Sequence, residues 1–183
     1  MARFAACLPP GGHVLDIGCG GGAPIAASLT AQGFAVTGID ASAPLLGLCR
    51  ERFPDGEWIL GDMRQMALGR TFDGLIAWDS FFHLNHDDQR AMVPRLAAHA
   101  APGAALMFTS GPGHGVALGR YAGEILFHAS LDAREYRALL AAQDFLVTGH
   151  AVEDATCGGR TVWLARRAAD GRTCGPAPDR GDA

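Results

Sequence analysis

The feature that most constrains this chain is a buried strand that runs directly into a dense cluster of glycines, Asp16-Ile17-Gly18-Cys19-Gly20-Gly21-Gly22. The apolar residues Val14, Leu15 and Ile17 predict the strand, and a helical run follows from Ile25 to Gln32. Glycine adopts backbone dihedrals closed to other residues and lets a ligand approach the main chain. The free N–H groups and the dipole of the following helix add partial positive charge. This order of elements predicts a site for a polar ligand.

Two acidic residues sharpen that prediction. The spacing Gly18-x-Gly20-x-x-Ala23 matches a dinucleotide-binding fingerprint, which is a weak signal on its own. Asp16 lies inside the strand, where a carboxylate is costly unless it has a polar partner or faces a cleft. Asp40 ends the next apolar run, roughly 20 residues further on, where an acid can bind ribose hydroxyls. Asp40 could instead cap the helix that follows it.

At these residues the chain resembles the class I S-adenosylmethionine (SAM)-dependent methyltransferases. The run from Asp16 to Gly22 matches their first motif, and Asp40 matches the acid at the end of their second strand. Asp62, in Gly61-Asp62-Met63, matches the acid after their third strand. The resemblance covers residues 11 to 167. It implies SAM as the cofactor and S-adenosylhomocysteine (SAH) as its product, and it says little about the methyl acceptor.

The resemblance also implies roles for individual residues. In the family, the first acid lies by the methionine end of SAM, the second binds the ribose, and the third and its successor contact the adenine. The implied cofactor-binding residues are Asp16, Gly18, Cys19, Gly20, Gly22, Asp40, Ala41, Asp62, Met63 and Asp79. The family segment after strand four, here Asp79 to Leu84, passes the reactive methyl group and often contains a histidine.

His83 is the candidate catalytic residue in that segment. It could take a proton from an acceptor hydroxyl or amine, or it could be a packed histidine at the entry to a helix. The neighbouring aromatic residues Trp78, Phe81 and Phe82 either line the site, where they would favour a sulfonium cation, or belong to the core. Methyl transfer is an in-line displacement, so positioning and water exclusion can supply much of the catalysis.

A group of potential metal ligands, His83, His86, Asp87 and Asp88, follows the same strand. Asn85 or Asp87 can instead cap a helix here, and acidic residues are favourable in a first helical turn. We therefore predict no metal at this position.

Strands alternate with helices five times and two strands close the chain, which predicts an α/β fold. The predicted strands after the first are 35–39, 57–60, 72–78, 104–109, 145–152 and 161–166. The predicted helices after the first are 44–53, 87–100 and 132–142, with Ser42 and Asp132 as N-caps of two of them. The resemblance implies a Rossmann-like, mostly parallel sheet of seven strands in the order 3-2-1-4-5-7-6. It places strand seven antiparallel and helices on both faces.

The segment Ser110–Leu131 contains five glycines and is predicted as a long loop. A long segment between regular elements is often functional, so Gly111 to His128 is predicted to form a mobile lid over the acceptor. Residues 1–167 are predicted to form one methyltransferase domain. Residues 168–183 are polar and rich in glycine and proline, which predicts a disordered tail.

The net charge of the chain and the absence of one motif indicate which class of methyl acceptor to expect. The net charge of −4 argues against a basic face that holds nucleic acid. The Asn/Asp-Pro-Pro-Tyr motif of the amino-group DNA and protein methyltransferases is absent, and the matching stretch is Asp79-Ser80-Phe81-Phe82. A small-molecule acceptor is therefore predicted, with no nucleic acid, no membrane partner, and a monomer or homodimer. The five scattered cysteines favour a cytoplasmic location.

Two other functions stay open at this point. An NAD-dependent oxidoreductase would also fit Gly-x-Gly-x-x-Ala followed by Asp40. Asp16 before the glycines, Asp62 after strand three and the closing pair of strands favour the methyltransferase. A non-catalytic module that binds SAM or a nucleotide is the third possibility, against which the intact cofactor motif argues.

Overall fold

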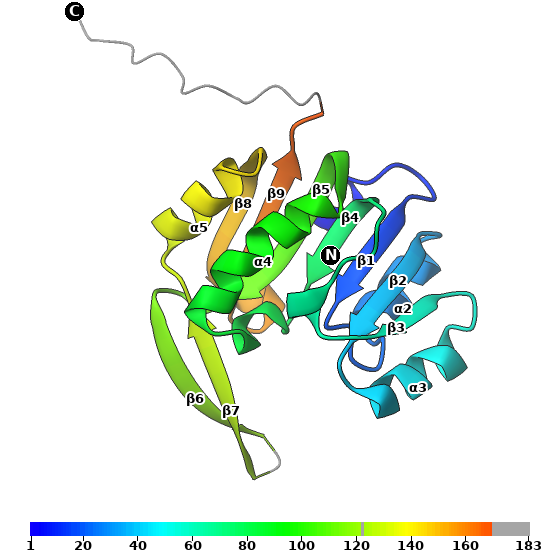
Figure 1. Ribbon diagram of the computed structural model, residues 1–183, viewed down its shortest axis with the longest axis horizontal. Coiled ribbons are helices and arrows are strands. Elements are labelled where there is room, and N and C mark those ends of the chain that lie inside the picture. Colours follow the sequence, from blue (N-terminus) through cyan, green and yellow to red (C-terminus); the bar gives the residue numbers. More distant parts are fainter. Residues whose placement is uncertain (122, 170–183) are drawn as a thin grey trace, which may run out of the picture.

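A seven-stranded sheet forms the centre of the computed structural model, which describes residues 1–121 and 123–169 (Figure 1). Its strands, in spatial order, are β3 (Glu57–Leu60), β2 (Ala35–Asp40), β1 (His13–Ile17), β4 (Phe72–Ala77), β5 (Ala100–Ser110), β9 (Arg160–Arg167) and β8 (Phe145–Asp154). The first five are parallel to one another, and β9 is antiparallel to both β5 and β8. Since β8 and β9 are the sixth and seventh strands of this sheet along the chain, the predicted fold class and strand order are confirmed.

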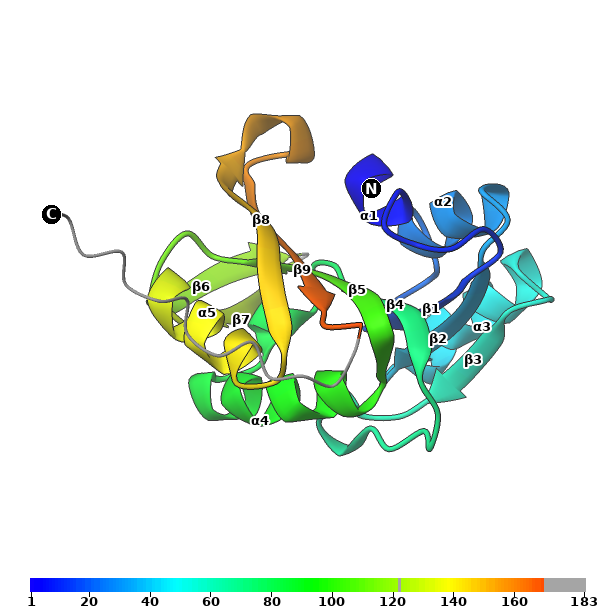
Figure 2. The same cartoon turned by 90° about the horizontal axis from the view of Figure 1, so that it is seen from above.

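Helices cover both faces of the sheet. On one face lie α1 (Ala2–Ala5), α2 (Ile25–Ala31) and α3 (Ala43–Arg52), and on the other lie α4 (His86–Ala98) and α5 (Ala133–Ala141) (Figure 2). Three short 3-10 helices are η1 (Met63–Gln65), η2 (Phe81–His83) and η3 (Ala155–Cys157). In the part of the chain that the structure describes, no helix is both long enough and apolar enough to cross a membrane.

Successive residues of the central strands point to two separate cores. On β1, Val14 packs with the helices α1 to α3, whereas Leu15 and Ile17 pack with α4 and α5. Burial on both faces explains why the parallel strands are almost continuously apolar. Asp16 lies on the same face as Val14, because side chains alternate along a strand. That alternation directs the carboxylate toward the layer of α2 and the glycine turn.

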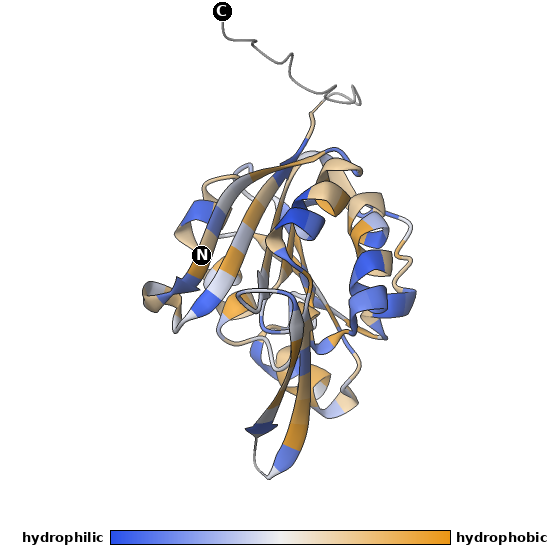
Figure 3. Ribbon diagram, turned by 90° about the vertical axis from the view of Figure 1, so that its left-hand side faces the viewer, coloured by the Kyte–Doolittle hydropathy of each residue, from blue (hydrophilic) through white to orange (hydrophobic). Residues whose placement is uncertain are grey.

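The segment predicted as a long loop is a β-hairpin, so that prediction was wrong. Its strands β6 (Gly115–Tyr121) and β7 (Glu124–Ser130) pair antiparallel as a two-stranded sheet that extends away from the main sheet (Figures 1 and 3). The glycines suggested irregular backbone. Large apolar residues nevertheless alternate with small ones, as in Val116-Ala117-Leu118-Gly119, and this period of two favours a strand.

The strand β5 is longer than predicted. It begins at Ala100 rather than Ala104 and includes Pro102 and Gly103. Its pairing with β4 shifts register between Phe72 and Gly74, so the irregularity is a bulge inside the strand. The predicted disordered tail falls almost wholly on residues 170–183, which lie outside the described residues.

A buried polar network joins α4 and α5 to the base of the hairpin. The side-chain amide of Gln89 donates to the carbonyl groups of Leu84 and Ala129, both at 2.8 Å. The Tyr136 hydroxyl donates to Gln89 Oε1 at 2.6 Å and accepts from the N–H of Leu131 at 3.2 Å. Burial raises the pKa of Tyr136 to about 12. Because each of these buried groups is paired, the network fixes where the hairpin leaves the domain.

Candidate functional site

Two adjoining cavities lie at the carboxyl ends of the parallel strands, where open α/β sheets bind ligands. The larger cavity, of about 770 Å³, is lined by Gly18, Gly20, Asp40, Ala41, Asp62, Met63 and Asp79 among others. The smaller cavity, of about 220 Å³, shares Gly18, Gly20 and Asp79 with it and adds Asp16 and Cys19. Nine of the ten predicted cofactor-binding residues therefore line one of the two cavities. The tenth, Gly22, lines neither.

The glycines of the turn have two different roles. A Cβ added to Gly20, whose φ is +54°, would meet no protein atom within 4 Å, so this position faces the open cavity. A Cβ added to Gly22 would lie 2.7 Å from a ring carbon of Phe53, so glycine is needed there for packing against the residue that follows α3. Gly20 thus borders open cavity space, whereas Gly22 holds the turn against the helix layer.

Asp40 connects the glycine turn to the next helix. Its Oδ2 accepts a hydrogen bond from the N–H of Gly20, and its Oδ1 accepts one from the N–H of Ser42, both at 2.8 Å. Ser42 is the N-cap residue of α3, as predicted, but its side chain makes no capping hydrogen bond. Asp40 therefore holds both the glycine turn and the start of α3 in place. Its carboxylate also lines the larger cavity.

Asp16 is the least satisfied polar group of the site. Its side chain is 2% exposed, and its Oδ2 has no hydrogen-bond partner among the described residues. Burial, with a smaller effect of the negative charge on Asp40, raises the pKa of Asp16 to about 7. Because an unpaired buried carboxylate is costly, a ligand cation in the smaller cavity would stabilise its ionised form. Burial also raises the pKa of the Cys19 thiol next to it.

Asp62 is held by its own turn. Its carboxylate accepts from the N–H of Arg64 at 2.9 Å, which caps η1, and from the Arg64 guanidinium at 2.6 Å. These hydrogen bonds hold the pKa of Asp62 below its usual range. Met63 follows and packs partly against the core while it lines the larger cavity. An ionised acid beside an apolar side chain suits a ring with exocyclic N–H donors.

Asp79 is paired with Arg160, a residue that the sequence did not single out. The backbone of Asp79 has a φ of +53°, and its N–H donates to Thr109 Oγ1 at 2.9 Å. Arg160 donates from Nε to Oδ1 at 2.7 Å and from Nη2 to Oδ2 at 2.6 Å. Arg160 begins the antiparallel strand β9, so it meets the carboxyl ends of the parallel strands. That position in the predicted strand order was the one available signal for it.

The three aromatic residues after β4 have separate positions. Phe81 belongs to the core, where its ring lies 5.2 Å from that of Phe108. Trp78 lines the smaller cavity. Phe82 lines a third cavity of about 510 Å³, which the first strand of the hairpin also borders, and its ring lies 4.7 Å from that of His128.

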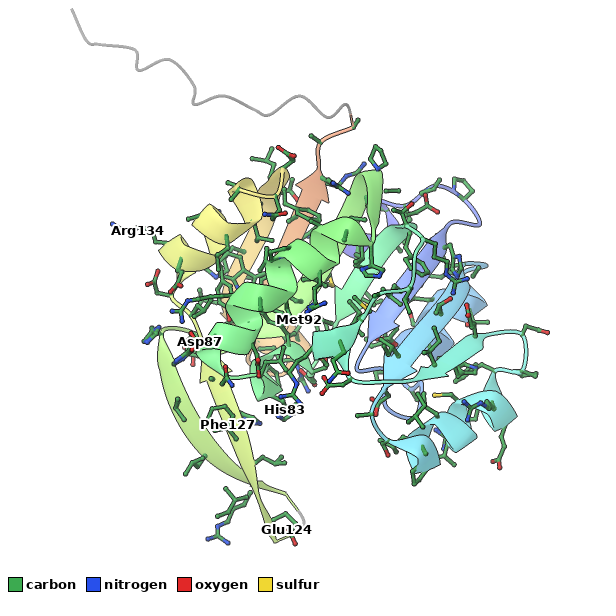
Figure 4. The ribbon with its side chains drawn as sticks, in the orientation of Figure 1. His83, Asp87, Met92, Glu124, Phe127 and Arg134 are labelled. Atoms are coloured by element: carbon green, nitrogen blue, oxygen red, sulfur yellow. The ribbon has the colours of Figure 1, made fainter. Side chains whose placement is uncertain are left out.

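Histidines connect the hairpin to the domain. His83 Nδ1 lies 3.2 Å from the carbonyl oxygen of Phe127, and its imidazole borders the larger cavity (Figure 4). His86 Nε2 lies 3.1 Å from the carbonyl oxygen of Gly115, so each hairpin strand receives one such contact. The ring of His128 lies 4.9 Å from that of His83. Burial, and then the charge of His83, lower the pKa of His128, which favours its neutral form.

The residues considered as metal ligands have other partners. The Asn85 side chain accepts from the N–H of Asp88 at 2.8 Å and caps α4. Asp87 pairs with Arg90 at 2.8 Å. Within residues 1–121 and 123–169, no three His, Cys, Asp or Glu side chains gather in an arrangement that could hold a metal ion.

Comparison with known proteins finds sequence similarity in the region that contains the glycine turn. Residues 14–103 match a family described as methyltransferase domain. A dTDP-3-amino-3,6-dideoxy-alpha-D-glucopyranose N,N-dimethyltransferase of Streptomyces fradiae is 34% identical over 96 residues, which are 51% of this chain and 37% of that protein. An 18S rRNA (guanine-N(7))-methyltransferase of Mus musculus is 35% identical over 92 residues, or 48% of this chain and 32% of that protein.

Among solved structures, one similar chain is SAM-bound CalS10, an amino pentose methyltransferase from Micromonospora echinaspora. The TM-score is 0.72 at 25% identity, over 91% of this chain and 88% of that chain. The present chain spans about a third of the length of the curated relatives quoted above. The sequence likeness is concentrated in the half of the chain that contains β1 to β4 and the glycine turn.

Proposed function

This chain belongs to the class I SAM-dependent methyltransferase family, and on that premise we propose that it transfers the methyl group of SAM to a small-molecule acceptor. Asp16 is the main support for the proposal, because its unpartnered Oδ2 lies in a cavity wall behind the glycine turn. SAM would bring an ammonium and a sulfonium cation there. NAD would instead bring a pyrophosphate to the same turn, and the charge of ionised Asp16 behind that turn would repel it.

The larger cavity suits the nucleoside part of SAM. A carboxylate offers about four acceptor positions, and Asp40 uses two of them for the N–H groups of Gly20 and Ser42. The remaining positions are proposed to accept from the ribose hydroxyls. Asp62, together with Met63, is proposed to bind the adenine. The backbone at Gly18 and Gly20 would then pass close to the amino-acid part in the smaller cavity.

When bound, SAM supplies an electrophilic methyl group on a sulfonium sulfur. Phe82, His83 and Phe127 border the adjoining space, where they would exclude water and orient an acceptor. If His83 Nδ1–H donates to the Phe127 carbonyl oxygen, Nε2 is the ring nitrogen with a free lone pair. We propose that this nitrogen accepts the proton that the acceptor hydroxyl or amine loses, which gives His83 both an anchoring role and a catalytic one.

The hairpin is proposed to form one wall of the acceptor pocket. It lies at the same sheet edge as the glycine turn, and Phe127 contributes to the larger cavity while His128 contributes to the cavity beside Phe82. A small-molecule acceptor is favoured by the net charge of −4 and by acidic residues along the cavity walls, which would repel a nucleic-acid backbone. The likeness to the amino-sugar N,N-dimethyltransferase supports the same class of acceptor.

The test is a transfer assay with SAM that carries a tritiated methyl group. The protein is incubated with a panel of dTDP-amino sugars, small hydroxylated aromatic compounds and an 18S rRNA fragment. The expected result is label in at least one small molecule and none in the RNA, and loss of all transfer in Gly20→Val. Label in the RNA alone would contradict the small-molecule assignment. Methyl transfer that survives in Gly20→Val would contradict the placement of the site.

A further inference from the structure

Arg160 is a cation that contacts two residues in the wall of the smaller cavity. It begins β9, directly after Gly158 and Gly159, and its guanidinium carbon lies 5.9 Å from the centroid of the Trp78 ring. Two of the residues that the guanidinium contacts, Trp78 and Asp79, line this cavity. In Figure 2 the connection between β8 and β9 rises on the side of the sheet that carries α1 and α2. Asp16 faces that same side.

The guanidinium retains unused hydrogen-bond donors. Asp79 takes the Nε–H and one N–H of Nη2, and the carbonyl oxygen of Cys157 takes one N–H of Nη1 at 2.8 Å. A guanidinium has five N–H groups, so one on Nη1 and one on Nη2 have no partner among the described residues. The Arg160 side chain is 39% exposed and that of Asp79 is 35% exposed. The pair is thus open to a ligand and not sealed in the core.

Two groups of opposite charge therefore lie in and beside the smaller cavity. Asp16 supplies a buried carboxylate oxygen without a partner in the described structure, which suits a cationic group. Arg160 supplies free N–H donors next to the same cavity, which suit a carboxylate. A ligand that carries an ammonium and a carboxylate on one carbon matches both. That combination is the chemistry of an α-amino acid.

We propose that Arg160 binds the α-carboxylate of the methionine part of SAM while Asp16 faces its α-ammonium. This inference rests on the proposed function and assigns part of the SAM site to the β8–β9 hairpin, far in sequence from the glycine turn. The Asp79 carboxylate holds the guanidinium in place through hydrogen bonds to Nε and Nη2. The Arg160 charge in turn offsets that of Asp79, which would otherwise repel the ligand carboxylate.

The experiment compares SAM with decarboxylated SAM, which keeps the ammonium and the sulfonium and lacks only the carboxylate. Affinities of both ligands are measured by isothermal titration calorimetry for the wild-type chain, Arg160→Gln, Arg160→Lys and Arg137→Gln. Arg137 is the control, because its guanidinium lies over Trp163, which lines none of the cavities described above. Circular dichroism checks that each variant is folded.

The wild-type chain should bind SAM about 10- to 100-fold more tightly than decarboxylated SAM, the range expected for hydrogen bonds to a charged group. Arg160→Gln should bind both ligands with the affinity that the wild-type chain has for decarboxylated SAM. Arg160→Lys should keep part of the preference, and Arg137→Gln all of it.

Equal binding of the two ligands by the wild-type chain would overturn the inference without any variant. An equal loss for both ligands in Arg160→Gln would also overturn it, since that result indicates a general structural role. If the wild-type chain bound neither ligand, the proposed function itself would fail. These outcomes separate an error about Arg160 from an error about SAM.

Discussion

The Asp40 carboxylate accepts a hydrogen bond from the N–H of Gly20 at 2.8 Å, so the end of β2 fixes the shape of the glycine turn after β1. The same carboxylate also borders the larger cavity. One acidic side chain therefore sets the conformation of the turn and offers acceptors to a ligand. This double role means that the loss of Asp40 should affect ligand binding by more than a direct contact alone.

Replacing Asp40 by alanine is expected to weaken SAH binding by about 1–3 kcal/mol or more, because a hydrogen bond to a charged group is removed and the turn loses its anchor. Asp40→Asn keeps one acceptor oxygen and should lose less. Calorimetric titration with SAH measures both. Affinity equal to that of the wild-type chain in Asp40→Ala would show that this residue serves the protein backbone alone.

Gly20→Val should abolish SAH binding while the chain still folds, because the added side chain projects into open cavity space. Gly69→Val is the matched control. Gly69 has a φ of +66° against +54° for Gly20, and a Cβ there also meets no protein atom within 4 Å, but Gly69 lines neither of the two adjoining cavities. Both variants carry the same backbone strain, so their melting temperatures should fall alike. Equal SAH affinity in the two variants would show that the site is misplaced.

The raised pKa of Asp16 predicts how the free energy of unfolding depends on pH. Its pKa is about 7 in the folded protein, above the ordinary aspartate value, so the folded chain keeps a proton that the unfolded chain loses above about pH 4. The stabilising contribution of protonated Asp16 is complete below about pH 4 and is lost as the pH rises through 7. At 1.36 kcal/mol per pKa unit, the free energy of unfolding should fall by up to about 4 kcal/mol.

Urea denaturation at pH 4.5, 6 and 8 tests this dependence. Asp16→Asn carries no titrating group at this position, so the free energy of unfolding of that variant should decline less than that of the wild-type chain. Parallel pH profiles for the two proteins would indicate that Asp16 is ionised in the free protein.

Ligand binding should show the opposite dependence on pH. The ammonium group of SAH favours ionised Asp16, so binding below about pH 7 must release the proton that Asp16 holds. SAH affinity should therefore increase from pH 5.5 to 7, by up to about tenfold per pH unit, and then become constant. Calorimetry in two buffers of different ionisation enthalpy measures the released proton directly. No proton release at pH 6 would contradict a role for Asp16 beside the ligand cation.

The parts of the site that are close in sequence could be predicted from local patterns. The strand, the glycine turn and Asp16 form one continuous signal, and Asp40 follows at the end of the next strand. The N-cap Asp132 was also predicted, and Asn85 was one of the two candidates for the cap of α4; each accepts a backbone N–H three residues ahead within its own turn. For such elements the sequence holds both the residue and its partner within a few positions.

Contacts between distant segments were not predictable in this way. Arg160 is 81 residues from Asp79, and the sequence around each residue contains no pattern that predicts this ion pair. Ser42 is the N-cap of α3, but its side chain makes no capping hydrogen bond, and the hydrogen bond from its backbone N–H to the Asp40 carboxylate was not predicted. In the segment from Ser110 to Leu131, glycine density outweighed the alternation of apolar residues, which can only be interpreted once a partner strand is known.

The buried network at the base of the hairpin gives a prediction about stability. Tyr136→Phe removes the hydroxyl that pairs with Gln89 Oε1 and with the N–H of Leu131, and leaves both groups buried without this partner. Urea denaturation should show a loss of about 1–3 kcal/mol in the free energy of unfolding. The double variant Gln89→Leu/Tyr136→Phe shows whether the cost comes from unpaired polar groups. Single and double losses that simply add would contradict coupling within the network.

The central claim is that the cavities at the glycine turn bind SAM and its product rather than a dinucleotide. Isothermal titration calorimetry of the wild-type chain with SAH and with NAD, under identical conditions, tests it most directly. The expected result is one SAH bound per chain, a higher melting temperature in the presence of SAH, and no binding of NAD. Saturable binding of NAD with no binding of SAH would contradict the claim and would instead indicate an NAD-dependent oxidoreductase.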